Sequence, residues 1–451
     1  MNFDIDRQTI SDLGLFNNRK DEKSIFSFYN RAETKGGQEL LHRLMRMPVA
    51  TIELLECRKA EINFFFSNDI SIHLVPRNID FIEYYLQVER SPLKNNVIDA
   101  YYDGIRNKLS NDSDYWNISM GLLHTIRLLF DLRLYVKKAK SLALPDSLEV
   151  DLDQLMDFLS ADVLVKSLNN PPDAMEDLTY SQISFLDYFF RVTKKEPFRA
   201  LLNILYKIDV LQSLAWLMKS NGLSLPEFTA ESKPTLEVTG AYYPLLKNPV
   251  SNNFNLTAES RLCFITGPNM AGKSTFLKTM GLMVYLSHLG FPVPAKKLVI
   301  SVFDGLFTTI NLSDNLDLGF SHFYAEVRRV KEVVAKLDAH QNLVVIFDEL
   351  FRGTNVKDAY DGSLSIISAL ASVKGSLFFI SSHLLEVAEN LHQRDSISFN
   401  CFESRLIDSK PVYDFKLRSG VSKERIGMLI IEKEHIMEML DGIIAQQNSH
   451  Q

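Results

Sequence analysis

The sequence has few of the features that mark secreted, metal-bound or membrane proteins. Its 451 residues include three cysteines, at positions 57, 263 and 401, which lie far apart and without the close spacing of a zinc site. The N-terminus has no apolar stretch of a secretory signal, and charges interrupt the longest apolar runs before they could cross a bilayer. These absences predict a reduced, cytoplasmic protein without a membrane segment.

An excess of positive charge is also missing. The formal net charge is −7, so no overall field attracts nucleic acid, and any contact with DNA must come from a local patch. Two basic clusters near predicted helix ends are candidates, although most such clusters are solvated helix ends that complement the helix dipole. Their members are Lys137, Lys138 and Lys140 in the first cluster, and Arg191, Lys194 and Lys195 in the second.

Residues 1–231 lack strand-like runs and are predicted to form an all-α domain. Apolar residues recur at helical spacing in five segments, residues 38–47, 52–66, 79–88, 115–144 and 197–219. The longest of these segments carries one apolar stripe that we expect to face a core. Its members are Leu122, Leu123, Ile126, Leu129, Phe130 and Leu134.

From residue 232 the pattern changes to short β-type runs that alternate with helical segments. The predicted strands are residues 235–239, 261–266, 298–300, 343–347 and 376–381, and the predicted helices are residues 276–289, 321–337, 359–372 and 384–391. A last strand-like pair, residues 397–404 and 410–417, precedes helices over residues 424–442. The alternation predicts an α/β domain with a largely parallel sheet over residues 232–430, followed by a C-terminal helix and polar tail over residues 431–451.

The α/β region contains a complete G-x-x-x-x-G-K-S/T pattern between a predicted strand and a predicted helix, the context of a P-loop (Walker A). Two glycines let the backbone approach a phosphate, so that successive N–H groups and the helix N-terminus point at the anion. Lys273 would add a point charge at the β- and γ-phosphates of ATP, and Ser274 a hydroxyl for Mg²⁺. The loop consists of Gly267, Pro268, Asn269, Met270, Ala271, Gly272, Lys273, Ser274 and Thr275.

Two further strands end in polar residues that complete such a site. Asp348 and Glu349 follow the apolar run 343–347; here Asp348 would support Mg²⁺ and Glu349 would activate water for hydrolysis. His383 follows the next strand, at the edge where parallel sheets bind ligands, and it could reach the γ-phosphate. Ser321 begins a predicted helix, where it would serve as an N-cap or present its hydroxyl to a phosphate.

These residues and their order resemble the ATPase domain of the MutS family of DNA mismatch-repair proteins. The motifs that carry the resemblance are Gly267-Pro268-Asn269-Met270 and the rest of the loop, Phe307-Thr308, residues 319–326, residues 348–354 and Ser382-His383. They cover about residues 235–430, and the Gly-Pro-Asn-Met loop is more specific than a general P-loop. Upstream, residues 34–48 are similar to the start of that family's helical core and lever domain.

The resemblance implies an ABC-type ATPase that dimerises head to tail. Lys273 and Ser274 would bind phosphate and Mg²⁺, Asp348 would support the metal, and Glu349 would activate water. Ser321 would complete the site of the partner subunit, and His383 would sense the γ-phosphate. Asn252 stands where the family places an asparagine near the nucleotide.

The sequence also departs from the family pattern. Ala271 replaces a usual glycine, a change that the loop can accept if φ at this residue is negative, and His322 stands where threonine is usual. The sequence begins at the lever-type helices, so the domain with the family's mismatch wedge and the connector domain are expected to be absent. We therefore expect branched or recombination intermediates to be better ligands than single mismatches.

Two functional hypotheses follow. The first is an ATP-dependent homodimer that binds double-stranded or branched DNA in mismatch repair or recombination. The second is an ATP-switched dimeric module that binds a protein and not DNA, which the acidic net charge favours. A transport or chromosome-type ABC ATPase is a weaker third hypothesis, because the Asn269-Met270 loop and the missing Leu-Ser-Gly-Gly signature argue against it.

Overall fold

The computed structural model describes residues 3–16, 23–110, 113–229, 233–310, 322–340, 342–351, 354–407, 410–422 and 435–448. The chain forms two compact units. The helical unit comprises Tyr29–Arg46 and Glu56–Asn221, and the α/β unit comprises Met1–Phe28, Met47–Leu55 and Gly222–Gln451. This grouping differs from a single boundary at residues 231 and 232, because two N-terminal segments belong to the α/β unit.

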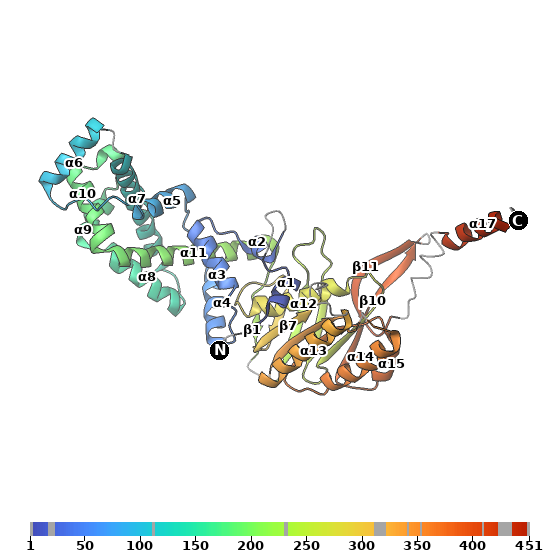
Figure 1. The fold of residues 1–451 in the computed structure, drawn as a ribbon. Coiled ribbons are helices and arrows are strands. Elements are labelled where there is room, and N and C mark those ends of the chain that lie inside the picture. Colours follow the sequence, from blue (N-terminus) through green and yellow to red (C-terminus); the bar gives the residue numbers. More distant parts are fainter. Residues whose placement is uncertain are drawn as a thin grey trace. The chain divides into compact units, whose positions relative to one another are not determined.

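The regular elements in the described residues of the helical unit are all helices, as the sequence pattern predicts (Figure 1). Its two longest described helices, α7 and α11, have 27 residues each and match the predicted segments 115–144 and 197–219 closely. The elements are α3 (Lys35–Met45), α4 (Ile52–Ser67), α5 (Pro76–Leu86), α6 (Val97–Ser110), α7 (Ser113–Ala139), α8 (Asp146–Leu159), α9 (Asp162–Asn169), α10 (Tyr180–Tyr188), a π-helical turn (Phe189–Thr193) and α11 (Lys195–Asn221).

The apolar stripe of α7 is confirmed except at its C-terminal end. Leu122, Ile126 and Leu129 are fully buried, whereas Leu134 is 52% exposed. The prediction for Leu134 is wrong because Leu132 and Val136 take the buried positions of that turn. A straight helix advances by 3.6 residues per turn, so a choice between neighbouring apolar residues at the end of a stripe depends on what packs against it.

A buried carboxylate joins α11 to the start of α3. Asp209 accepts hydrogen bonds from the backbone N–H of Glu33 (3.0 Å), and from the N–H (2.9 Å) and hydroxyl (2.7 Å) of Thr34. The Thr34 hydroxyl in turn accepts from the N–H of Gly37 and caps the helix. A Cβ atom on Gly37 would lie 2.4 Å from the Asp209 carboxylate. The close approach of α11 to α3 therefore explains why residue 37 is glycine.

The second basic cluster is not a continuous exposed patch. Arg191 is buried and forms a bidentate ion pair with Asp187 (2.7 and 3.1 Å). Its guanidinium also donates to the carbonyl oxygens of Val88 and Arg90. Arg191 therefore ties the π-helical turn to the segment after α5 and is unavailable to DNA. Lys194 and Lys195 remain exposed.

The α/β unit contains a largely parallel sheet, as predicted. The strand order in the described residues is β1-β7-β8-β9-β5-β10-β11, and every neighbouring pair is parallel except the antiparallel β10 and β11. The strands are β1 (Asp4–Ile5), β5 (Leu262–Thr266), β7 (Gly305–Thr309), β8 (Leu343–Asp348), β9 (Leu377–Ser381), β10 (Ile397–Ile407) and β11 (Lys410–Ser419). Every residue of β5, β7, β8 and β9 is buried, as expected for a parallel sheet covered on both faces.

Helices cover the two faces of this sheet (Figure 1). Val345 and Phe347 of β8 belong to the core cluster that also holds residues of α13 (His322–Ala339), α14 (Val356–Leu370) and α15 (Leu385–Leu391). Ile346 points to the opposite face, where a Cβ atom on Gly281 of α12 (Lys273–Ser287) would lie 3.2 Å from it. Successive strand residues alternate between the two faces of a sheet. Of these four helices, α13, α14 and α15 therefore cover one face of β8 and α12 covers the other.

A second, four-stranded sheet was not expected from the sequence. Its order is β2-β6-β3-β4, with β2 (Glu227–Phe228), β3 (Thr235–Ala241), β4 (Asn252–Thr257) and β6 (Lys297–Ile300). Two strands that the sequence predicts, residues 235–239 and 298–300, pair with each other here instead of entering the main sheet. At the end of the chain, α17 (Ile436–Asn448) begins inside the predicted helical segment 424–442 but continues past its predicted end into the predicted polar tail. Residues 424–434 of the predicted segment lie outside the described residues.

The N-terminal segment is part of the α/β unit because its polar side chains bond to β7. The Asp12 carboxylate accepts hydrogen bonds from the Thr308 hydroxyl (2.7 Å) and the Ile310 N–H (2.9 Å). Arg329 of α13 donates to Asp6 (2.5 Å) and to the carbonyl oxygen of Thr308 (2.8 Å). Together with the pairing of β1 and β7, these bonds fix the edge of the main sheet.

A buried histidine gives the α/β unit a predicted pH dependence. His288 Nδ1 bonds to the Val284 carbonyl oxygen (2.7 Å) and Nε2 accepts from the Phe303 N–H (2.9 Å), which requires the neutral ring. Burial lowers the pKa of His288 to about 4. The stabilisation from the neutral ring is therefore complete above the ordinary pKa of 6.5 and is lost as pH falls towards 4. Between pH 7.5 and 5 we expect a loss of about 2 kcal/mol in the free energy of unfolding.

Urea unfolding of the wild type and His288→Gln at several pH values measures this effect. The stability difference between the two proteins should shrink as pH falls, because only the wild type loses the contribution of a neutral histidine. A difference that stays constant from pH 7.5 to 5 would show that His288 does not titrate in this way.

Candidate functional site

The glycine-framed loop lies between β5 and α12, and its backbone requires glycine at both ends. Gly267 has φ 139° and Gly272 has φ 109°. A Cβ atom on Gly267 would lie 2.5 Å from the carbonyl oxygen of Phe402. Ala271 is buried and is not among the residues with positive φ, so it meets the condition set by the sequence, whereas Met270 takes φ 66° and is 85% exposed.

Lys273 is the first residue of α12, and its ammonium group is held at the loop. Its Nζ donates to the carbonyl oxygens of Gly267 (2.8 Å) and Pro268 (3.1 Å), and it lies 3.3 Å from His383 Nε2. The residue is 5% exposed. A buried ammonium held by carbonyl oxygens is a site of concentrated positive charge, as anion binding requires.

Asp348 and Glu349 lie beside the C-terminal end of the neighbouring strand, β9. Asp348 pairs in register with Ser381, whose hydroxyl donates to the Asp348 carboxylate (2.5 Å). The Glu349 N–H bonds to the carbonyl oxygen of Ser381 (3.2 Å), and Glu349 takes φ 64°, a strained conformation for a residue with a side chain. This local turn directs the Glu349 carboxylate to His383 Nε2, at 2.6 Å. Lys273, His383 and Glu349 thus form one chain of contacts.

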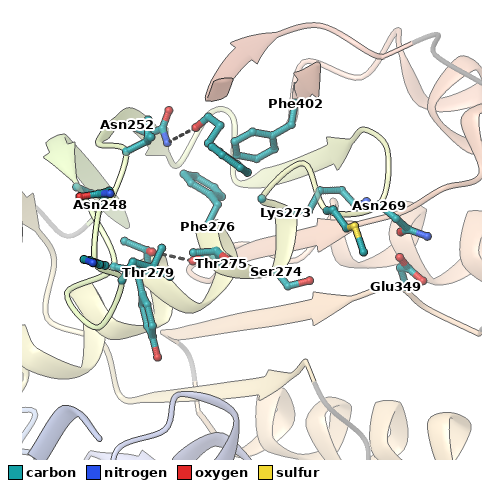
Figure 2. A pocket seen from close by; sticks show the side chains of 18 residues that line it. Asn248, Asn252, Asn269, Lys273, Ser274, Thr275, Phe276, Thr279, Glu349 and Phe402 are labelled. Atoms are coloured by element: carbon teal, nitrogen blue, oxygen red, sulfur yellow. Dashed lines mark hydrogen bonds between the residues drawn. The ribbon is translucent and has the colours of Figure 1, made fainter. Parts of the chain in front are cut away.

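A cavity of about 620 Å³ lies beside the loop (Figure 2). Asn269, Met270, Gly272, Lys273, Ser274, Thr275 and Glu349 line it, and Ser274 is exposed there. The sequence did not indicate the rest of the wall, which includes Tyr243, Leu246, Phe276, Phe402 and Phe415. These residues come from the segment after β3, from α12 and from the β10–β11 pair, and they form no local motif. Only the fold could place them together.

Asn252 reaches the same cavity from β4. Its side-chain amide donates to the Phe415 carbonyl oxygen (3.0 Å) and its Oδ1 accepts from the Leu417 N–H (2.8 Å). The amide therefore joins β4 to β11 and fixes the wall that carries Phe415. Figure 2 shows the first of these hydrogen bonds at the edge of the cavity.

One candidate residue, Ser321, lies outside the described residues, as do residues 311–320. Within the described ranges no cluster of three or more His, Cys, Asp or Glu residues could hold a metal by itself. The Ser274 hydroxyl and the Asp348 carboxylate offer hard oxygen ligands, which suit Mg²⁺ when phosphate oxygens and water supply the rest.

One described helix, α11, is long and apolar enough to span a bilayer by length and composition. In the structure 72% of its apolar window is buried. This burial is what the core helix of a folded domain shows.

The fold and the site together define a mixed α/β domain with a glycine-framed loop and a cavity at the carboxyl edge of a parallel sheet. Residues 263–447 match the model of MutS domain V, an ATPase domain. Over these residues the chain is similar to proteins of the MutS family.

Several relatives are similar to the second half of the chain. The DNA mismatch repair protein MutS of Bacillus licheniformis is 28% identical over 252 residues, which are 54% of this chain and 28% of the relative. That of Aquifex pyrophilus is 29% identical over 284 residues (58% and 33%), and that of Ehrlichia ruminantium strain Gardel is 32% identical over 230 residues (49% and 28%). The chain therefore aligns with about a third or less of the length of these relatives.

Proposed function

We propose that the α/β unit is an ABC-type P-loop ATPase that binds ATP in the cavity beside residues 267–275. The observation that carries the proposal is the contact chain from Lys273 through His383 to Glu349 at the mouth of this loop. A cation for phosphate, a carboxylate for water and a histidine between them are the groups that γ-phosphate hydrolysis needs. The same site lies in the region that matches MutS domain V.

The roles follow from position. The loop N–H groups would surround the phosphates, and Lys273 would exchange its bonds to the Gly267 and Pro268 carbonyl oxygens for bonds to the β- and γ-phosphates. Ser274 and Asp348 would hold Mg²⁺, which supplies charge neutralisation when bound. The aromatic end of the cavity, with Phe276 and Phe415, would receive the base.

Hydrolysis would begin at Glu349. Its carboxylate would orient the attacking water and take its proton, while His383, at 2.6 Å, would hold the carboxylate and respond to the γ-phosphate. Binding of ATP would separate Lys273 from His383 and so report the nucleotide to Glu349. The Ser321 of a second copy would complete the site, so two chains would form a homodimer with composite sites, and ATP would favour the closed dimer.

We further infer that the helical unit binds double-stranded or branched DNA, and that ATP controls this binding in mismatch repair or recombination. The supporting observations are the family match and the names of the relatives. A cytoplasmic location accords with this role. The alternative, an ATP-switched module that binds a protein, is favoured by α8, which carries Asp146, Glu149, Asp151, Asp153 and Asp157 and no basic residue.

Replacement of Lys273 tests the nucleotide site. Lys273→Met removes the buried ammonium, so we expect ATP affinity to fall at least tenfold and hydrolysis to fall to background, because a charge-assisted contact to phosphate contributes about 1.5–3 kcal/mol. Equilibrium binding of a fluorescent ATP analogue and phosphate release measure the two effects. Lys374→Met, on an exposed turn remote from the loop in sequence, is the matched control. Unchanged ATP binding in Lys273→Met would exclude this cavity as the site.

A further inference from the structure

The helical unit carries a cluster of aromatic and basic side chains on α5 and α7. Phe81 lies at its centre, with ring centroids 6.3 Å from Trp116 and 5.3 Å from His124. The Arg77 guanidinium lies 5.9 Å from the centre of the Phe81 ring. Arg127 follows His124 by one helical turn on α7, and these five residues define the Trp116 cluster.

The aromatic part of this cluster is open to solvent. Trp116 is 45% exposed, and Tyr84, one turn after Phe81 on α5, is 55% exposed. Large aromatic side chains are favoured at binding surfaces because they contribute contact area at low cost in conformational entropy. Neither Trp116 nor Tyr84 fills the core between α5 and α7, which is occupied by residues such as Ile82, Tyr85 and Leu122.

The exposed face of α7 continues the cluster with positive charge. Arg133 donates to the Asn169 amide oxygen and Lys138 to the Asp69 carbonyl oxygen, so neither charge is neutralised by those partners. Lys137 is exposed beside them. Arg127 bonds to the carbonyl oxygens of Pro172 and Asp173, with the Asp173 carboxylate at 3.8 Å. Asp131 is an exposed acidic residue one turn after Arg127, so residues 127–138 carry four basic side chains and one acidic side chain, a positive excess although the whole chain is acidic.

His124 adds an aromatic surface to this face. Its Nδ1 is buried and has no hydrogen-bond partner among the described residues. Burial, with the nearby charges of Arg127 and Arg77, lowers the pKa of His124, so the ring is neutral at physiological pH. A neutral ring can stack on a base without adding a further charge.

We propose that the Trp116 cluster binds single-stranded DNA, with an unpaired base stacked on Trp116 and the adjoining phosphates at Arg77 and the basic face of α7. The proposal rests on the inferred DNA binding of the helical unit and adds to it the class of DNA. Aromatic rings bind bases whose faces are free, whereas the bases of an intact duplex are already stacked. Basic side chains alone would not distinguish the two forms.

The chain offers a direct probe, because it has two tryptophans and the other, Trp216, lies on α11. In Trp216→Phe, Trp116 is the only tryptophan. Titration of this protein with a 20-nucleotide oligo-dT at low salt should quench the fluorescence in a saturable manner. Trp116→Leu should weaken oligo-dT binding about tenfold, as loss of one stacked base does. Trp116→Phe should retain most of the affinity.

Controls separate this inference from the proposed function. Trp216→Leu, at a site that is 56% exposed, should leave the affinity unchanged. If the protein binds duplex or four-way-junction DNA in an ATP-dependent way, but Trp116→Leu binds oligo-dT as well as the wild type, the stacking site is wrong and the proposed function stands. If oligo-dT quenches Trp116 and ATP changes nothing, the stacking site stands and the ATP coupling is wrong. No quenching of Trp116 by saturating oligo-dT overturns the inference.

Discussion

Glu349→Gln should lower the rate of ATP hydrolysis about 10²- to 10⁴-fold, the range expected for loss of a general base. The amide cannot take a proton from water, but it occupies the same space and can still bond to His383, which lies 2.6 Å from the carboxylate. ATP binding should therefore persist, and the protein should accumulate as an ATP-bound dimer. Steady-state hydrolysis, ATP binding and sedimentation velocity on one preparation measure all three properties.

Glu386→Gln provides the control, because Glu386 is exposed at the start of α15 and does not line the cavity. This variant should hydrolyse ATP at the wild-type rate. Normal hydrolysis by Glu349→Gln would show that another group is the base. Loss of ATP binding in Glu349→Gln would instead mean that the negative charge beside His383 is needed to keep the site competent for the nucleotide.

Arg191→Met should destabilise the helical unit by about 3–5 kcal/mol, the cost of leaving one member of a buried ion pair without its partner. Asp187 is completely buried, and in this variant it would keep the N–H of Leu93 (2.7 Å) as a donor but lose the guanidinium. The carbonyl oxygens of Val88 and Arg90 would also lose their donor. Urea unfolding followed by helix circular dichroism measures the change.

Lys194→Met is the matched control, because Lys194 is exposed three residues further along the same turn. Its free energy of unfolding should change by less than about 0.5 kcal/mol. Equal stability of the Arg191 and Lys194 variants would contradict the assignment of Arg191 as a structural residue. In that case Arg191 would belong to the second basic cluster, as the sequence predicts.

The parts of the fold that follow from local pattern were predictable. The apolar runs of β5, β8 and β9 are short, continuous and bounded by polar residues, as buried parallel strands require. The loop from Gly267 to Thr275 can be recognised from the sequence alone, because its glycines and lysine have the spacing of a P-loop. Because parallel strands end at one edge, placing Glu349 and His383 near Lys273 needed only the order of the strands.

The parts that depend on distant pairing were not predictable. β1 has two residues and no periodicity, and it exists because its backbone pairs with β7, which lies about 300 residues later. Asp12 belongs to no local sequence motif, because its hydrogen-bond partners Thr308 and Ile310 are also about 300 residues away in the sequence. The aromatic wall of the cavity has the same origin, because Phe402 and Phe415 belong to strands that only the sheet brings to the loop.

The central claim is that ATP hydrolysed in this cavity controls binding to DNA. The most direct test measures hydrolysis and gel shift on the same wild-type protein with homoduplex, mismatched and four-way-junction DNA, with and without ATP, across a salt series. We predict hydrolysis together with DNA binding that salt weakens, as phosphate contacts require, and that ATP alters. Hydrolysis without affinity for any of these DNAs at low salt would contradict the claim and favour the module that binds a protein.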